Sequence, residues 1–401
     1  MAHSIDTIIE PDLLVWARES SGLQLETAAK KMGVKPAKLA DWESGKLRPT
    51  IVQARRAAKA YRRPLAALFM SRPPSELFTP TSVREFRKGT VELTSEVLPS
   101  IIFAIRKAYQ KRAIALELLS QLDEKPREFP FTATLSDRSE DLGRKVREIL
   151  QVPPQEQFRW SDAYEALRSW RKSVESIGVL VLQSSDVSWE AMRGCSLALN
   201  PLPVIVLNSK DTVHGRIFTL FHEVGHIALK SSALCDFNDQ KGVDKQAETF
   251  CNALAAAVLV PEQNFRADLE NWSDAIQRRL SDSELDEVAR ELSQKYRVSE
   301  ETIVLRMAEV GAISFEAYRQ KRPDLLTVYR RIKSARAKGG PPPHRKALAN
   351  NGPFFSRLVL DAYNQGHITE SEVCDYLEVR TKQVSKIEGA LLQGSFGADG
   401  M

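Results

Sequence analysis

The chain has 401 residues, 43% of them hydrophobic and 27% charged, which is typical of a globular protein with more than one domain. Its apolar runs are too short to span a membrane, and the N-terminus lacks a secretory signal pattern, so we expect a cytoplasmic protein with no membrane partner. Four scattered cysteines without a CxxC pair argue against a disulfide framework or a cysteine-rich zinc module.

The net charge of +5 is unevenly distributed along the sequence. Residues 1–75 contain 13 Lys and Arg against 7 Asp and Glu, and residues 322–346 contain 8 basic residues against one acid. Basic clusters of this kind can contact a phosphate backbone, although a solvated helix face or a linker is the better explanation for a charge run taken alone.

The first 75 residues have apolar spacing that predicts five short helices. Two of them, in LETAAKKMG and KPAKLADWESG, are joined by a turn containing Gly33, which fits a helix-turn-helix whose second helix can enter a major groove. The stretch LQLETAAKKMGVKPAKLADWESGKLRPT resembles the helix-turn-helix domain of the XRE (Cro/C1-type) repressor family.

The resemblance implies a recognition helix from about Pro36 to Ser44. It places four residues among the outward, DNA-contacting positions, namely Lys35, Ala37, Lys38 and Asp41. A helix-turn-helix used only for dimerisation or partner docking is the alternative. With Lys35 included, this recognition helix offers two lysines and no Arg, Asn or Gln, which argues against tight sequence specificity.

Residues 76–155 read as a charged helical connector, and a different pattern starts near Trp160. The order there is a helix, the strand VLVLQ, and two short strands within MRGCSLALNPLPVIVLNSK that turn at Asn200-Pro201. The helix RIFTLFHEVGHIALK follows. This order predicts a small α+β unit with a small sheet in a chain that is otherwise mostly α.

The sequence HEVGH places His222 and His226 four residues apart, so both imidazoles share one helix face, and Glu223 lies beside the first. This is the HExxH arrangement of zinc peptidases, in which the glutamate is the general base. The alternative, two histidines of an ordinary amphipathic helix, explains neither the spacing nor the glutamate. We expect the strand LPVIVLN to offer an edge beside this helix where an extended peptide substrate pairs.

Catalytic zinc takes three protein ligands and keeps one open position. The next helix carries Glu248 among small apolar residues, where a carboxylate is unfavourable unless it is paired or bound to metal, so Glu248 is the predicted third ligand. A carboxylate interacting with the helix dipole is the alternative. Asp244 and Cys251 are lesser candidates. His214 and Arg216 are candidates for the acid or oxyanion partner, although we favour structural roles for both.

The order HExxH, ExxCN and LAAAVLVP resembles the ImmA/IrrE family of metallopeptidases. The resemblance implies that His222, His226 and Glu248 bind the metal and that Glu223 is the base. It implies Zn²⁺ as the cofactor, and Mn²⁺ or Fe²⁺ also suit this ligand set. Cys251 stands where alanine is usual, at a packing position. Further matching pieces are VREFRK (83–88), WRKSVESIGVLVL (170–182), MRGCSL (192–197) and PVIVLN (203–208).

After the peptidase motifs, residues 283–311 look like a small helix-turn-helix segment, ARAKGGPPPHRK reads as a linker, and ITESEVCDYLEVRTKQVSKIEG is similar to a third such unit. The predicted domains are 1–75 (XRE-type helix-turn-helix), 76–155 (helical connector), 156–275 (ImmA/IrrE-like core), 276–320 (helix-turn-helix-like segment) and 321–401 (basic linker and C-terminal helices).

Together the two resemblances imply a regulatory metal-dependent endopeptidase. Its expected partners are DNA, through the N-terminal domain, and a protein substrate, a small helix-turn-helix repressor or antitoxin whose cleavage relieves repression in a stress, mobile-element or phage context. An oligomer is compatible with this reading. The alternative is a DNA-binding transcriptional regulator whose peptidase-like domain is a sensor or scaffold without proteolysis. A weaker third alternative is a toxin–antitoxin or defence component that acts through protein contacts alone.

Overall fold

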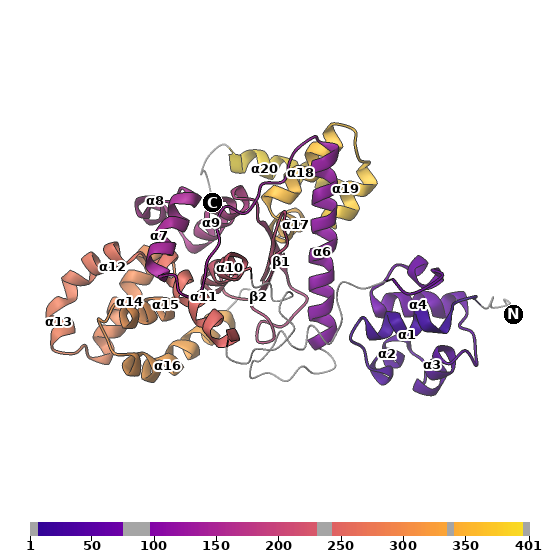
Figure 1. The fold of residues 1–401 in the computed structure, drawn as a ribbon, viewed down its shortest axis with the longest axis horizontal. Coiled ribbons are helices and arrows are strands. Elements are labelled where there is room, and N and C mark those ends of the chain that lie inside the picture. Colours follow the sequence, from indigo (N-terminus) through magenta and orange to yellow (C-terminus); the bar gives the residue numbers. More distant parts are fainter. Residues whose placement is uncertain (1–6, 75–96, 231–242, 335–340, 396–401) are drawn as a thin grey trace. The chain divides into compact units, whose positions relative to one another are not determined.

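A computed structural model describes residues 7–74, 97–230, 243–334 and 341–395 of the chain (Figure 1). They fall into two compact units, one of residues 1–109 with 186–192 and the other of residues 110–185 with 193–401. The predicted motif at 83–88 lies outside the described residues, as does Cys235, and the other three cysteines are free thiols. No helix within the described ranges is long and apolar enough to cross a membrane.

The first unit is built from short helices, as the sequence predicts. Its elements are α1 (Pro11–Glu19), α2 (Leu25–Met32), α3 (Pro36–Glu43), α4 (Ile51–Tyr61), the 3₁₀ turn η1 (Leu65–Phe69) and the start of α6 (Val97–Gln121). Gly33 ends α2 in the left-handed conformation with φ of 69°, where glycine carries no steric penalty. Thr50 and Gln53 form a capping box that starts α4. A bidentate ion pair between Arg18 and Glu43 ties α1 to α3.

The second unit contains a three-stranded sheet in the order β1-β3-β2. Its strands are β1 (Leu180–Ser184), β2 (Gly194–Leu197) and β3 (Val204–Asn208), with β3 parallel to β1 and antiparallel to β2. The expectation that LPVIVLN supplies the free edge was therefore wrong, because β3 is the central strand and β2 lies at the edge. The reason is that VIVLN is apolar throughout and buried along its whole length, which suits a strand paired on both sides.

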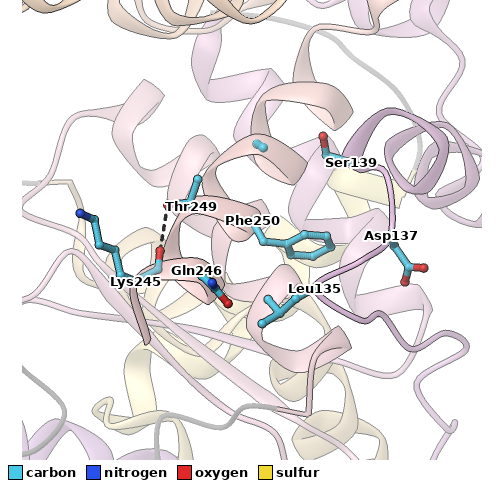
Figure 2. A pocket seen from close by; sticks show the side chains of 8 residues that line it. Leu135, Asp137, Ser139, Lys245, Gln246, Thr249 and Phe250 are labelled. Carbon is cyan, nitrogen blue, oxygen red and sulfur yellow. Dashed lines mark hydrogen bonds between the residues drawn. The ribbon is translucent and has the colours of Figure 1, made fainter. Parts of the chain in front are cut away.

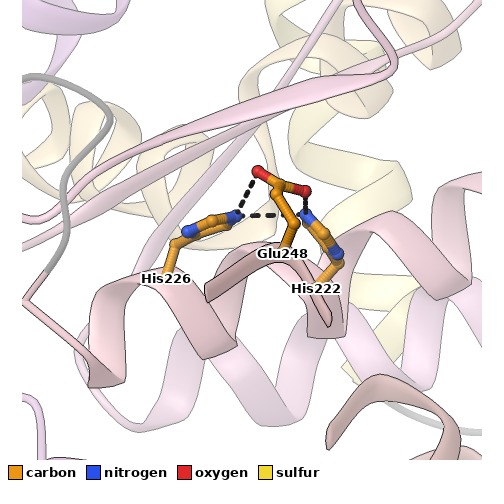
Figure 3. A group of neighbouring side chains, drawn as sticks. All are labelled: His222, His226 and Glu248. Carbon is orange, nitrogen blue, oxygen red and sulfur yellow. Dashed lines mark hydrogen bonds and ion pairs between the residues drawn. The ribbon is translucent and has the colours of Figure 1, made fainter. Parts of the chain in front are cut away.

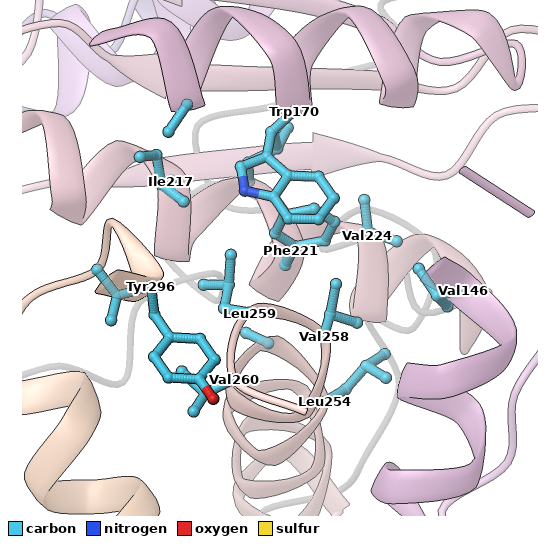
Figure 4. Packing of buried hydrophobic residues seen from close by; sticks show 14 of the residues in the cluster. Val146, Trp170, Ile217, Phe221, Val224, Leu254, Val258, Leu259, Val260 and Tyr296 are labelled. Atoms are coloured by element: carbon cyan, nitrogen blue, oxygen red, sulfur yellow. The ribbon is translucent and has the colours of Figure 1, made fainter. Parts of the chain in front are cut away.

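The core of this unit lies between the sheet and four helices, α7 (Ser139–Leu150), α9 (Ala163–Ser176), α10 (Val213–Ala228) and α11 (Val243–Leu259). The rings of Trp170 on α9 and Phe221 on α10 meet edge to face with centroids 4.8 Å apart (Figure 4). Leu254 and Val258 of α11 complete the packing beneath them. The core also includes Val146 of α7, from the segment read as a connector.

The remaining elements are helical. They are α8 (Pro154–Arg159), α12 (Glu262–Leu269), η2 (Glu270–Trp272), α13 (Ser273–Gln277), α14 (Asp282–Tyr296), α15 (Glu300–Glu309), α16 (Phe315–Ser334), α17 (Pro343–Asn351), α18 (Pro353–Asn364), α19 (Glu370–Leu377), η3 (Thr381–Gln383) and α20 (Val384–Ser395). The predicted α+β class with a mostly helical chain is confirmed.

Two details of the C-terminal half differ from the sequence interpretation. The basic segment from 322 onward continues α16 to Ser334, and the end of the expected linker, 343–346, forms the first turn of α17. Proline at the first helical position explains the second difference, because its fixed φ favours a helix start. The helix α17 packs against β1, where Arg171 of α9 donates to the backbone oxygens of Ala349 and Val181.

Candidate metal centre

Two neighbouring helices position the candidate ligands. The helix α10 carries His222 and His226 one turn apart, and α11 packs directly against it. The close approach depends on Gly225, because a Cβ there would lie 2.9 Å from Sγ and 3.2 Å from Cα of Cys251. The glycine within HEVGH therefore sets how near Glu248 of α11 comes to the two imidazoles.

The structure brings the three predicted ligands into one group (Figure 3). The two Nε2 atoms lie 3.1 Å apart, and the Glu248 carboxylate oxygens lie 3.2 Å from His222 Nε2 and 3.3 Å from His226 Nε2. Ligands about 2.0–2.1 Å from a tetrahedral zinc are separated by about 3.3–3.4 Å, so these spacings fit one ion. The imidazoles are 16% and 13% exposed and the carboxylate is 57% exposed, so the group opens to solvent on the Glu248 side.

Hydrogen bonding orients the first histidine. His222 Nδ1 donates to Oδ1 of Asn252 over 2.9 Å, which leaves the lone pair of Nε2 pointing at the group, as a metal ligand requires. The sequence showed that Asn252 lies one turn after Glu248 but not what it contacts.

The charges of the group also suit a cation. Burial alone would raise the pKa of Glu248, but its contacts with the imidazoles of His222 and His226 outweigh burial and hold that pKa well below its usual range. Burial alone would lower the pKa of His222, whereas the contacts with Glu248 and the negative charge of Glu223 raise it. The group therefore presents an ionised carboxylate beside two imidazoles, and the carboxylate charge favours a cation there.

The side chain of Glu223 is held by the sheet. Its Oε2 accepts a hydrogen bond of 2.7 Å from the hydroxyl of Ser196 on the edge strand β2, and both side chains are buried. A Cβ at Gly194 would lie 3.4 Å from the other oxygen, Oε1, so glycine at the start of β2 keeps space beside it. Sequence reasoning missed Ser196, because nothing local relates a strand serine to a helix residue 27 positions later.

The lesser candidates whose side chains the structure describes do not join the group. Cys251 packs under Gly225, and burial raises the pKa of its thiol, which disfavours a thiolate ligand. Arg216 donates to Gln183 over 2.8 Å inside the fold. Burial, and then the charge of Arg297, lower the pKa of His214 to about 4. The side chain of Asp244 lies outside the described residues.

An open hollow of about 610 Å³ lies on the adjoining face of α11 (Figure 2). Phe250 and Leu135 are the large apolar residues among those that line it. None of the three converging side chains lines it, so the hollow and the candidate metal centre are separate features. The lining residues are Leu135, Asp137, Ser139, Lys245, Gln246, Thr249, Phe250 and Ala253.

The helix-turn-helix unit exposes most of the predicted DNA-contacting residues. Leu39 and Trp42 anchor α3 in the core of the unit. The side chains of Lys35, Ala37 and Lys38 are exposed, whereas that of Asp41 is half-buried. The turn after α3 adds exposed Lys46 and Arg48, which sequence reasoning did not single out as contact residues.

The fold and the site define a helix-turn-helix protein with a metallopeptidase-like domain. Comparison with protein families agrees with this description. Residues 175–308 match the model of the peptidase M78 family, described as the IrrE N-terminal-like domain, and residues 14–68 match the helix-turn-helix model. The predicted fusion of these two domains is confirmed. No curated protein matches the chain.

Proposed function

We propose that the protein is a regulatory, zinc-dependent endopeptidase that cleaves a small helix-turn-helix repressor or antitoxin and so relieves repression, in a stress, mobile-element or phage context. The observation that carries the proposal is the convergence of His222, His226 and Glu248, with Glu223 adjacent and fixed by a strand. Mn²⁺ or Fe²⁺ are the other ions that the two-imidazole, one-carboxylate set accepts.

His222 Nε2, His226 Nε2 and a Glu248 oxygen would hold the cation. Bound there, a divalent ion supplies Lewis-acid chemistry, polarising the scissile carbonyl and acidifying water. Oε1 of Glu223 takes the proton from the attacking water and passes it to the leaving amine. Ser196 keeps Oε2 occupied, so that the carboxylate presents a fixed oxygen to the reaction.

The edge strand supplies a reason to expect an extended peptide as substrate. On its outer side, β2 pairs with no other strand among the described residues. A peptide segment can therefore add to the sheet beside β2, with main-chain hydrogen bonds that hold it in line with Ser196 and Glu223.

The helix-turn-helix domain supports DNA as the second partner and the cytoplasm as the location. Its exposed Lys35 and Lys38 supply positive charge where α3 would approach a groove. Such a domain would bring the peptidase to a promoter or to the repressor bound there. The five predicted domain ranges are part of this proposal.

The test uses the purified protein with zinc and small helix-turn-helix proteins encoded beside its gene, with products identified by mass spectrometry. Glu223→Gln removes the proton acceptor and should slow cleavage by about 10² to 10⁴-fold without releasing metal. Glu287→Gln makes the same chemical change on the exposed face of α14 and should cleave like the wild type.

Cleavage by Glu223→Gln at the wild-type rate would contradict the role of Glu223. If no such protein is cleaved while DNA binding survives metal removal, the alternative of a transcriptional regulator with a scaffold domain replaces the endopeptidase.

A further inference from the structure

Three helix pairs share one type of turn. The first pair, α2 and α3, lies in the first unit, and the other two, α14 with α15 and α19 with η3 and α20, lie in the second. In each, the first helix ends at a residue in the left-handed conformation, a valine follows, an extended residue comes next, and the second helix begins. In the third pair this second helix starts with the 3₁₀ turn η3 and continues as α20. The φ angles of the left-handed residues are 69°, 54° and 58° in chain order. The turns are Gly33-Val34-Lys35, Arg297-Val298-Ser299 and Glu378-Val379-Arg380.

The third pair matches the first in more than the turn. Its leading helix α19 has 8 residues, as α2 has, whereas α14 has 15. In α3 the buried anchors are Leu39 and Trp42, six and nine residues after the left-handed residue. In the third pair the buried residues at the same two offsets are Val384 and Ile387. The second helix of the third pair is therefore anchored by the same face as α3.

The middle pair cannot present its second helix to a partner in this way. The helix α15 buries Ile303, Val304 and Met307 in the core of the second unit, and Arg306 is 1% exposed. In the third pair, Lys382, Ser385 and Lys386 remain exposed. Only the first and third pairs leave the outward face of the second helix accessible.

The outward face of the third pair is basic. At offsets of two, four and eight residues from the left-handed residue, the first pair has Lys35, Ala37 and Asp41. The third pair has Arg380, Lys382 and Lys386 at these offsets, all exposed. None of these three cations pairs with an acid in the part of the chain that the structure describes.

Nearby acids do not cancel this charge. Glu372 in the first turn of α19 is engaged in a capping box with Thr369, and the exposed acids of the pair are Glu370, Asp375, Glu378 and Glu388. None of these acids occupies the offsets of the four predicted contact residues of the first pair, and at the offset of the fourth, Lys38, the third pair has the neutral Gln383.

We propose that residues 369–392 form a second DNA-contacting helix-turn-helix, in which Arg380, Lys382 and Lys386 bind phosphates or base edges. Arginine and lysine are the side chains that most often contact guanine, and each phosphate contact adds salt-dependent affinity. DNA binding by this unit depends neither on the peptidase site nor on its proposed activity.

The test is fluorescence anisotropy of the full-length protein on a short labelled duplex of arbitrary sequence, between about 50 and 200 mM salt. All variants carry Lys35→Gln and Lys38→Gln, which weaken the first unit. Adding Lys382→Gln and Lys386→Gln removes two phosphate contacts. The negative slope of log affinity against log salt should therefore become shallower by about 1.8, and binding should weaken roughly 30-fold near 0.15 M salt.

The matched control is Arg168→Gln with Lys172→Gln, which removes two exposed cations four residues apart on α9. It should leave the salt slope unchanged, and Lys382→Arg with Lys386→Arg should retain binding. Equal binding by the control and the Lys382/Lys386 variant would overturn the proposal. The proposal would also fail if the Lys382/Lys386 variant kept its DNA binding but no longer bound a co-encoded protein, because the face would then be a protein interface.

Discussion

Replacing Gly225 by alanine tests whether close contact between α10 and α11 builds the candidate metal centre. The new Cβ would lie 2.9 Å from Sγ of Cys251 and 3.2 Å from its Cα, and the second contact is with backbone that cannot rotate away. Overpacking of this kind costs about 2–3 kcal/mol, whereas alanine gains about 1 kcal/mol over glycine in a helix interior. The net loss is about 1–2 kcal/mol.

The measurement is thermal unfolding together with zinc affinity. A loss of 1–2 kcal/mol lowers Tm by about 2–6 °C for a unit of this size. Because α11 must shift outward, Glu248 moves from the imidazoles and zinc affinity should fall as well. Cys251→Ala removes Sγ from the contact, so the double variant should recover part of both losses.

Gly389→Ala is the matched control, because it makes the same change inside α20, where a Cβ meets nothing within 4 Å. It should raise Tm slightly. If Gly225→Ala raises Tm as much as Gly389→Ala and leaves zinc affinity unchanged, close packing does not position the site.

Three further outcomes follow from the contacts of the site and its helix. Asn252→Ala removes the acceptor that orients His222 and should weaken zinc binding about 10- to 100-fold by competition titration, against no change for an exposed asparagine elsewhere. Ser196→Ala should lower kcat about tenfold while metal content, measured by mass spectrometry, stays the same, and an equal loss of metal would contradict its role in holding Glu223. The pKa of His214 is lowered to about 4 in the folded state, so its contribution to stability is present above pH 6.5 and lost as pH falls toward 4. His214→Gln should therefore reduce the loss of stability between pH 7 and 5 by up to about 2 kcal/mol, and identical Tm–pH curves would refute this.

Local patterns predicted the elements that carry the site. The spacing of His222 and His226 needs only one helix, and the order of the motifs HExxH and ExxCN singled out Glu248. The burial argument for Glu248 was wrong, because this carboxylate is 57% exposed and lies in the polar first half of α11. The helix-turn-helix was equally readable, since Gly33 and the apolar spacing define it within a short segment. Both family comparisons agree with these local readings.

Long-range contacts could not be read in the same way. The strand order that puts β2 at the edge depends on β3 pairing with β1, and a short apolar run does not reveal its neighbours. The roles of Ser196 and Asn252 depend on how the sheet and α11 meet α10. Composition also misled at 343–346, where prolines indicated a linker but also start α17.

Metal analysis of the purified wild type beside Glu248→Ala tests the central claim most directly. The account predicts about one divalent ion per wild-type chain and loss of most of it in Glu248→Ala. The control Glu287→Ala, on the exposed face of α14, should retain the ion. A wild type that binds no divalent ion, or a Glu248→Ala variant that holds it with unchanged affinity, would contradict a metal centre formed by His222, His226 and Glu248.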